Sequence, residues 1–130
     1  MISFDTTVVM RFVVALPPEQ FVSAKAYIKK LRASGQQAYI SNLTLSEAYF
    51  AAQTHYGFTK SAALDGLAQI SRMPGIITTP EAAEVLSLPN LASAKPGFVD
   101  RLIHGESTAR GHTLVTFEKA AKNLSNTLIL

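Results

Sequence analysis

Short apolar runs alternate with amphipathic segments along most of this chain, and glycine and proline residues separate them. Apolar runs of this length, rich in Ile, Val and Leu, predict buried strands. The strands are expected over residues 1–4, 38–40, 75–78, 113–117 and 127–130. Apolar residues that recur every three to four positions predict amphipathic helices in the segments between them. The helices are expected over residues 8–15, from Pro18 to just before Gly35, and over residues 43–56, 59–72, 80–86, 98–109 and 118–124.

Polar residues at the segment ends predict where several helices begin. Thr6 or Thr7 is expected to cap the first helix, and Ser41 and Asn42 the third. Strands that alternate with helices indicate an α/β fold with a parallel sheet. The length of 130 residues matches one domain, so a single domain over residues 1–130 is predicted.

The amino-acid composition excludes several classes of protein. The chain is 48% hydrophobic and has no Cys, which excludes disulfide scaffolds, zinc ribbons, thiolate nucleophiles and iron–sulfur clusters. No apolar run approaches the roughly 18 residues of a membrane helix, and no secretory signal pattern is present, so a cytoplasmic protein without a membrane partner is expected. The net charge of +3 is compatible with a polyanionic partner but is only weakly informative.

Four of the nine acidic residues lie at the ends of predicted strands or near the beginnings of predicted helices. Asp5 comes directly after the first predicted strand, and Glu118 directly after the strand over residues 113–117. Glu47 and Asp100 lie near the beginnings of two predicted helices. Ligands of open parallel α/β sheets bind outside the carboxyl ends of the strands, so these carboxylates are expected to converge. The alternative is that Glu47 and Asp100 only interact favourably with their helix N-termini, which is worth ~0.3–1 kcal/mol each.

A cluster of Asp5, Glu47, Asp100 and Glu118 would require a cation or protons. Two like charges ~4 Å apart repel by about 4 kcal/mol at an effective dielectric constant of about 20. Oxygen ligands without Cys favour Mg²⁺ or Mn²⁺ over zinc. A divalent ion held by carboxylates suits phosphodiester hydrolysis, because it neutralises the phosphate and lowers the pKa of an attacking water.

The acids lie within longer stretches that resemble a known family. These stretches are Ile-Ser-Phe-Asp-Thr-Thr-Val at residues 2–8, Ser-Glu at 46–47, Phe-Val-Asp-Arg-Leu-Ile at 98–103, and Arg-Gly-His-Thr-Leu-Val-Thr-Phe-Glu-Lys at 110–119. In order and spacing they resemble the PIN-domain family, especially the toxin ribonucleases of VapBC-type toxin–antitoxin pairs. The resemblance spans essentially the whole chain.

The resemblance implies a three-layer α/β/α sandwich with a central, mostly parallel sheet of four to five short strands. It also implies an endoribonuclease that uses Mg²⁺ or Mn²⁺, acts on RNA, forms a homodimer and is blocked by a cognate antitoxin protein. Asp5, Glu47 and Asp100 match the first three acids of the family motif, and Glu118 stands where the family usually has Asp. Thr116 matches a hydroxyl residue that helps to hold the water or a carboxylate.

Two departures from the family pattern support an alternative function. Thr7 replaces the usual Asn or Ser, and Glu118 is one methylene longer than Asp. On these grounds a catalytically weak or inactive PIN-fold module that binds nucleic acid or protein is the alternative. A phospho-receiver domain is disfavoured because Thr78 and Thr79 occupy the position of its phosphorylated Asp.

Three further groups of residues have both a functional and a structural interpretation. A basic stripe, formed by Lys25, Lys29, Lys30 and Arg32, could contact an RNA backbone, but a solvated helix face is the preferred interpretation. An aromatic cluster, formed by Tyr49, Phe50, Tyr56 and Phe58, favours helix packing or a dimer interface over base stacking. His104 lies one helical turn after Asp100, and a structural role is preferred for it.

Overall fold

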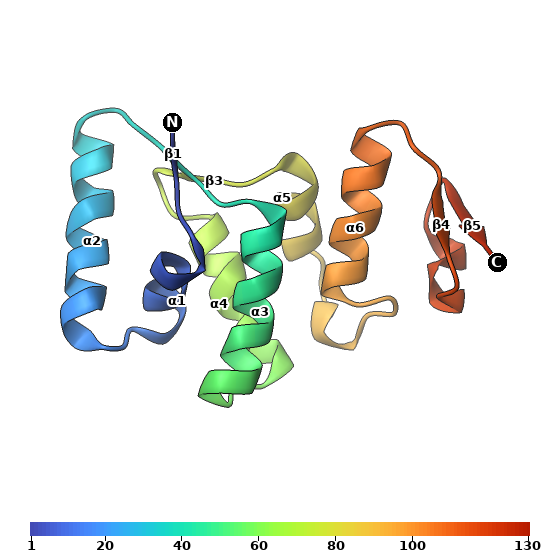
Figure 1. The fold of residues 1–130 in the computed structure, drawn as a ribbon, viewed down its shortest axis with the longest axis horizontal. Helices are drawn as coiled ribbons and strands as arrows, with labels where there is room; N and C mark the ends of the chain where they lie inside the picture. Colours follow the sequence, from blue (N-terminus) through green and yellow to red (C-terminus); the bar gives the residue numbers. More distant parts are fainter. The chain divides into compact units, whose positions relative to one another are not determined.

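The computed structural model describes all residues from Met1 to Leu130 and divides into two compact units, residues 1–79 and residues 80–130 (Figure 1). Each unit contains helices and short strands. The first unit contains β1 (Ile2–Ser3), α1 (Thr6–Val14), α2 (Pro18–Ala33), β2 (Ala38–Tyr39), α3 (Asn42–Tyr56), α4 (Lys60–Ser71) and β3 (Ile76–Ile77). The second contains α5 (Pro80–Leu86), the 3₁₀ helix η1 (Leu91–Ser93), α6 (Phe98–Ala109), β4 (Leu114–Thr116), the 3₁₀ helix η2 (Lys119–Asn123) and β5 (Thr127–Ile129).

The first unit is built around a three-stranded parallel sheet with the order β1-β2-β3. Ile2 pairs with Ala38, which in turn pairs with Ile76. The pairing continues past the strands, since the amide of Phe4 donates to the carbonyl of Tyr39 at 2.9 Å. Because all three strands run in the same direction, their carboxyl ends lie along one edge of the sheet.

Local capping determines where the helices of the first unit begin. The carboxylate of Asp5 accepts a hydrogen bond from the amide of Val8, so Asp5 is the N-cap of α1. The prediction that Thr6 or Thr7 caps this helix is therefore wrong, and the reason is that both residues already lie in the first turn. Ser41 caps α3 as predicted, whereas Asn42 is the first helical residue. Gly57 ends α3 with a φ of 67°, which glycine adopts without a steric penalty.

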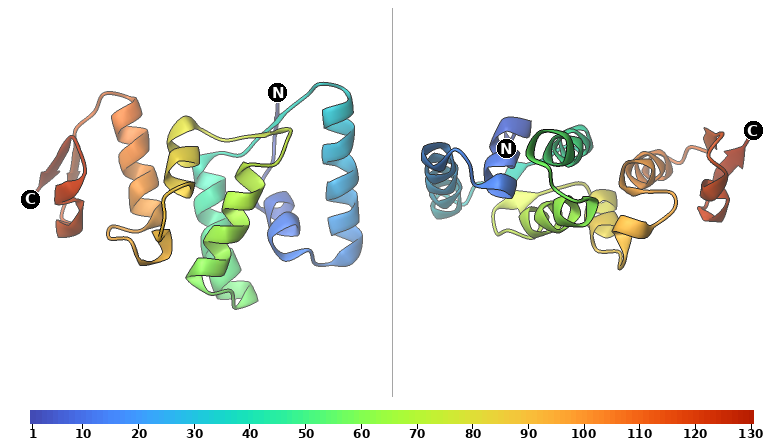
Figure 2. Two further views of the ribbon diagram at one scale, coloured as in Figure 1. Left: turned by 180° about the vertical axis from the view of Figure 1, so that it is seen from behind. Right: turned by 90° about the horizontal axis from the view of Figure 1, so that it is seen from below.

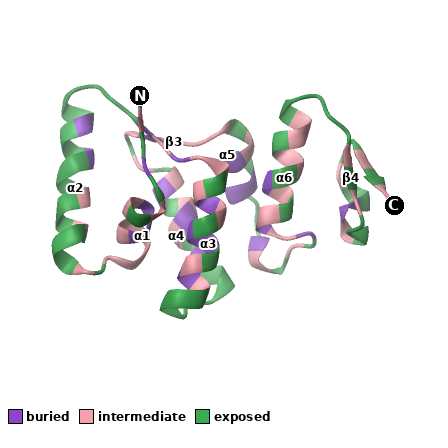
Figure 3. Ribbon diagram, viewed as in Figure 1, coloured by how far each residue is buried: buried purple, intermediate pink, exposed green.

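The core of the first unit lies between the sheet and its helices. Helix α3 packs against both α1 and α4, and Figure 2 shows α3 and α4 side by side from behind. Val9, Ile40, Leu45 and Leu67 are almost completely buried. Figure 3 shows buried positions along α3 and α4. Burying side chains of this size stabilises a fold by about 1.5–3 kcal/mol each, so this unit has a substantial core.

The second unit has a smaller core, formed where α5 packs against α6. Phe98 and Leu102 of α6 are buried, as are Ala82 and Val85 of α5. Gly105 allows the two helices to approach closely, because a Cβ atom there would lie 2.8 Å from the Cβ of Glu81. After α6, the strands β4 and β5 form a two-stranded parallel sheet in which Val115 pairs with Leu128.

The structure confirms an α/β fold with six α-helices and short parallel strands. Five strands form, but they belong to a three-stranded and a two-stranded sheet rather than to one sheet of four to five strands. The difference arises because strand pairing is a long-range property that short apolar runs do not encode. A single domain over residues 1–130 stays a prediction. None of the helices has the length and apolar character needed to cross a membrane.

Candidate functional site

The carboxyl edge of the three-stranded sheet carries a row of polar residues, one group after each strand. Asp5 follows β1, Ser41 and Asn42 follow β2, and Thr79 follows β3. The hydroxyl of Thr79 donates to Oδ1 of Asn42 at 2.9 Å and so links the ends of β2 and β3. The sequence interpretation gave neither Asn42 nor Thr79 a role at this edge, although their positions directly after two predicted strands could have indicated one.

Asp5 is the best-defined acid of this edge. Its Oδ1 atom accepts a hydrogen bond of 2.6 Å from the hydroxyl of Thr7 and one of 3.1 Å from the amide of Val8. The Thr7 hydroxyl is the main reason that the pKa of Asp5 lies below its ordinary value, and the Val8 amide adds to the effect. The Asp5 side chain is exposed. An exposed, ionised carboxylate held by two donors is well suited to contact a cation.

Thr7 keeps a hydroxyl within reach of the Asp5 carboxylate. Its hydroxyl donates directly to the neighbouring carboxylate, and the extra methyl group does not prevent this contact.

Glu47 lies in the second turn of α3, whose first turn follows the end of β2. Its side chain is exposed and makes no hydrogen bond or ion pair within the chain. Leu43 and Phe50 lie one turn before and one turn after Glu47 on the same helix, and they are 79% and 52% exposed. Glu47 thus belongs to an exposed face of α3 that also carries two large apolar side chains.

The aromatic residues that lie on α3 differ in burial and in their contacts. Tyr49 is buried and contacts the ring of Phe50 edge-on, with 5.1 Å between the ring centroids. The hydroxyl of Tyr56 accepts a hydrogen bond of 3.1 Å from Arg11. Tyr49 and Tyr56 therefore serve helix packing, which is one of the two preferred interpretations of the cluster, and the exposed Phe50 is available for other contacts.

The second unit supplies the other two acids of the predicted cluster. Asp100 is the third residue of α6 and is exposed, with no hydrogen bond or ion pair to its side chain. Glu118 follows β4 and is the N-cap of η2, because its Oε1 atom accepts from the amide of Ala120 at 3.0 Å. The hydroxyl of Thr116 accepts from the amide of Glu118 at 3.0 Å, so Thr116 fixes the backbone from which Glu118 projects.

Two neighbours of Asp100 on α6 have structural roles. The Nε atom of Arg101 donates to the carbonyl of Pro96 at 2.7 Å. The Nε2 atom of His104 lies 2.7 Å from the carbonyl of Ser125 and so links α6 to the loop before β5. Both contacts hold the segments around the acids in place.

The placement of the four acids can be stated unit by unit. Asp5 and Glu47 lie in the first unit, and Asp100 and Glu118 lie in the second, together with Thr116. Neither unit by itself contains three or more His, Asp or Glu side chains grouped so that they could hold a metal ion. Each unit does place an acid two residues after the end of a parallel strand, as the N-cap of the next helix.

Comparison with known proteins adds no assignment to this site. The chain matches no protein-family model, and searches of curated proteins and of solved structures give no match.

Proposed function

We propose that the protein is a ribonuclease that depends on Mg²⁺ or Mn²⁺, and that it is the toxin component of a toxin–antitoxin pair. The observation that carries the proposal is the repeated placement of acids at the carboxyl ends of parallel strands. Asp5 follows β1 in the first unit, and Glu118 follows β4 in the second. Carboxyl ends of parallel strands are where α/β proteins bind their ligands.

The chemistry of the donors fits a hard divalent cation. All four proposed ligands are carboxylates, and none of them pairs with a cation within the chain. The pKa of Asp5 lies below an ordinary value that is already well under neutral pH, so this carboxylate is charged at pH 7. Carboxylate oxygens are the ligands that Mg²⁺ and Mn²⁺ prefer.

The proposal includes the single sheet expected from the sequence. Asp5 and Glu47 belong to the first unit, and Asp100 and Glu118 belong to the second. β1 is an edge strand of its sheet, and β4 also has one edge without a partner strand. The three-layer sandwich with one parallel sheet of four to five strands stays a prediction from the family resemblance.

The residues have distinct parts in the proposed reaction. Asp5, Glu47 and Asp100 would hold the ion and orient the attacking water, and Glu118 would give weaker support. Thr116 positions Glu118 through its backbone amide. A bound divalent ion would supply charge neutralisation at the scissile phosphate and would lower the pKa of the water.

The proposed partners are an RNA substrate, a second copy of the chain and an antitoxin. The homodimer is proposed from the family resemblance alone, because Leu43 and Phe50 share their helix face with Glu47 and a dimer through that face would cover a proposed ligand. An antitoxin would block the acids, for example by inserting a basic side chain among them.

RNA cleavage tests the proposed activity directly. The purified protein, free of any antitoxin, should cleave single-stranded RNA in the presence of Mg²⁺ or Mn²⁺ and lose this activity with EDTA. Asp5→Asn removes a proposed ligand and should lower the rate by at least ~100-fold. Glu19→Gln is the matched control, since Glu19 is an exposed acid in the first turn of α2 and is not a proposed ligand. Equal rates for the wild-type protein and Asp5→Asn, or metal-independent cleavage, would contradict the proposal.

One observation favours the alternative function of a non-catalytic binding module. Glu118 uses Oε1 to cap η2 and Asp5 uses Oδ1 to cap α1, so part of each carboxylate has a structural task. A module of this kind would bind RNA or protein but would not bind Mn²⁺ at these acids.

A further inference from the structure

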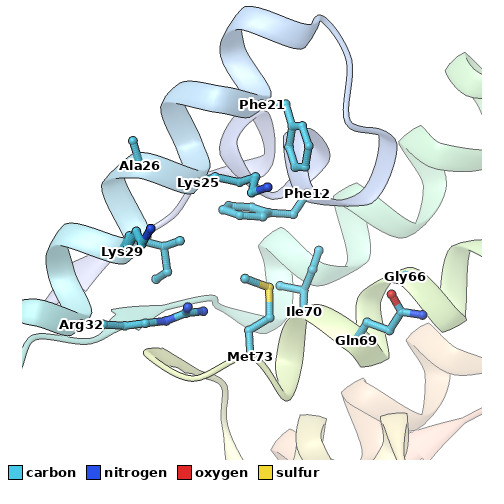
Figure 4. A pocket seen from close by; sticks show the side chains of 11 residues that line it. Phe12, Phe21, Lys25, Ala26, Lys29, Arg32, Gly66, Gln69, Ile70 and Met73 are labelled. Atoms are coloured by element: carbon cyan, nitrogen blue, oxygen red, sulfur yellow. The ribbon is translucent and has the colours of Figure 1, made fainter.

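A cavity of about 600 Å³ lies between α2 and α4 in the first unit (Figure 4). Its walls are mainly apolar and include Phe12 of α1, Phe21 and Ile28 of α2, Ile70 of α4 and Met73 beyond it. The volume lies within the range of ~300–1,000 Å³ that is typical of small-molecule sites. None of the acids of the proposed metal site lines this cavity.

The polar side of the cavity is cationic. Lys25, Lys29 and Arg32 line it from α2, where their spacing places them on one helix face. Figure 4 shows the three side chains along the same side of the cavity. No carboxylate lines the cavity, and none of the three cations forms an ion pair within the chain.

Two of these cations are held in place by their surroundings. The Nε atom of Arg32 donates to the carbonyl of Pro74, which leaves the terminal nitrogens of the guanidinium group free. The Nζ atom of Lys25 lies 5.1 Å from the centroid of the Phe21 ring, within the range of a cation–π contact. Lys30 lies on the same helix but does not line the cavity.

We infer that this cavity binds a small anionic amphiphile, namely a medium-chain fatty acid. The apolar walls would hold the hydrocarbon chain, and Lys25, Lys29 and Arg32 would contact the carboxylate. An RNA backbone is a poorer match, because phosphates gain nothing from walls formed by Phe, Ile and Met. The cavity thus gives a specific role to three members of the basic stripe, and this role does not depend on the proposed nuclease activity.

Calorimetry with decanoate, below its micelle concentration, tests the inference on the full chain. Saturable binding with one site is expected. Octanoate should bind roughly 10-fold more weakly, since each buried methylene contributes ~0.8 kcal/mol. Decyltrimethylammonium, which has the same chain length and a positive head, should bind at least about 10-fold more weakly than decanoate.

Substitutions on α2 locate the site. The double variant K25Q/K29Q should weaken decanoate binding roughly 5- to 10-fold, because it removes two cations that face the cavity. K30Q is the matched control and should change the affinity less than about 2-fold. Ala26→Trp places a large side chain at an exposed position that lines the cavity, so it should abolish binding. Circular dichroism would verify that each variant is folded.

Three results would overturn the inference. The first is no saturable binding of decanoate by the folded wild-type protein. The second is equal weakening by K25Q/K29Q and K30Q, or equal binding of the two head groups. The third is a wild-type dimer in sedimentation velocity that Ala26→Trp converts to a monomer, since the cavity would then be covered by a second copy of the chain.

Discussion

The two sheets of this protein are both parallel and both consist of very short strands, yet they differ in how well their side chains are buried. In the first, Ala38 of β2 is completely buried and Ile76 of β3 nearly so. In the second, Val115 and Leu128 are 52% and 51% exposed, and they lie directly opposite each other. Phe117 and Leu130, just beyond the two strands, are 79% and 68% exposed.

This difference indicates that the second sheet is incomplete by itself. Parallel sheets occur almost only where both faces are covered, and two strands alone are marginally stable in water. An apolar face formed by Val115 and Leu128 therefore needs a cover.

The largest expected effect is the difference in unfolding free energy between truncating a buried side chain of the first unit and truncating an exposed one of the second sheet. Leu45→Ala removes a completely buried side chain of α3 and should lower the free energy of unfolding by ~2–5 kcal/mol. Leu128→Ala makes the same chemical change on the exposed face of β5 and should cost less than about 1 kcal/mol. Urea denaturation followed by circular dichroism measures both values. A cost for Leu128→Ala as large as that for Leu45→Ala would show that the second sheet is covered in solution.

A smaller difference is expected between two helical glycines, one in each unit. Gly105→Ala should destabilise the protein by ~1–3 kcal/mol, because the new Cβ would lie 2.8 Å from the Cβ of Glu81. In Gly66→Ala the new Cβ would lie 3.3 Å from Cγ1 of Val13, a tight contact that a shift of a few tenths of an ångström relieves, and the helix gains up to ~1 kcal/mol of propensity, so the change should be nearly neutral. Thermal unfolding of the two variants provides the comparison. Equal changes in Tm would mean that α5 and α6 separate easily enough to accommodate the methyl group.

The smallest expected effect concerns the charge of Asp5. Thr7→Val removes the hydroxyl that does most to lower the pKa of Asp5, so the pKa should move up toward its ordinary value. Because the folded pKa is lowered, the stabilisation from this hydrogen bond is fully present above pH ~4 and is lost as the pH falls through the lowered pKa. The difference in stability should stay below about 1 kcal/mol, since the carboxylate is exposed.

Carbon-13 NMR titration of the Asp5 carboxyl group checks this prediction in the wild-type protein and in Thr7→Val. Thr6→Val is a useful control, because Asp5 Oδ1 accepts from the hydroxyl of Thr7 and not from that of Thr6. An unchanged pKa in Thr7→Val would show that the hydroxyl does not hold the carboxylate in solution.

The sequence was a good guide to the helices because local signals determine their ends. Gly57 ends α3 and Pro80 begins α5, and both boundaries agree with the predictions. Helix α6 also has the predicted bounds, Phe98–Ala109. The cap of α1 was missed because Asp5, a residue type that both caps helices and binds metals, was considered only as a ligand.

The sequence was a poorer guide to long-range pairing. It predicted the five strands but not their division into two sheets, since two-residue strands such as β1 carry almost no register information. For the site, it predicted that Asp5 and Glu118 follow strands, which the structure confirms. The convergence of Asp5 with Asp100 stays a prediction, because it depends on contacts between residues far apart in the chain.

Calorimetric titration with Mn²⁺ tests the proposed metal site most directly. The account predicts saturable binding by the wild-type protein that either Asp5→Asn or Asp100→Asn abolishes, although these residues belong to different units. Glu106→Gln, a change to an exposed acid of α6 outside the proposed site, should bind Mn²⁺ like the wild-type protein. Absence of binding by the wild-type protein, or binding that survives both Asp substitutions, would contradict the account.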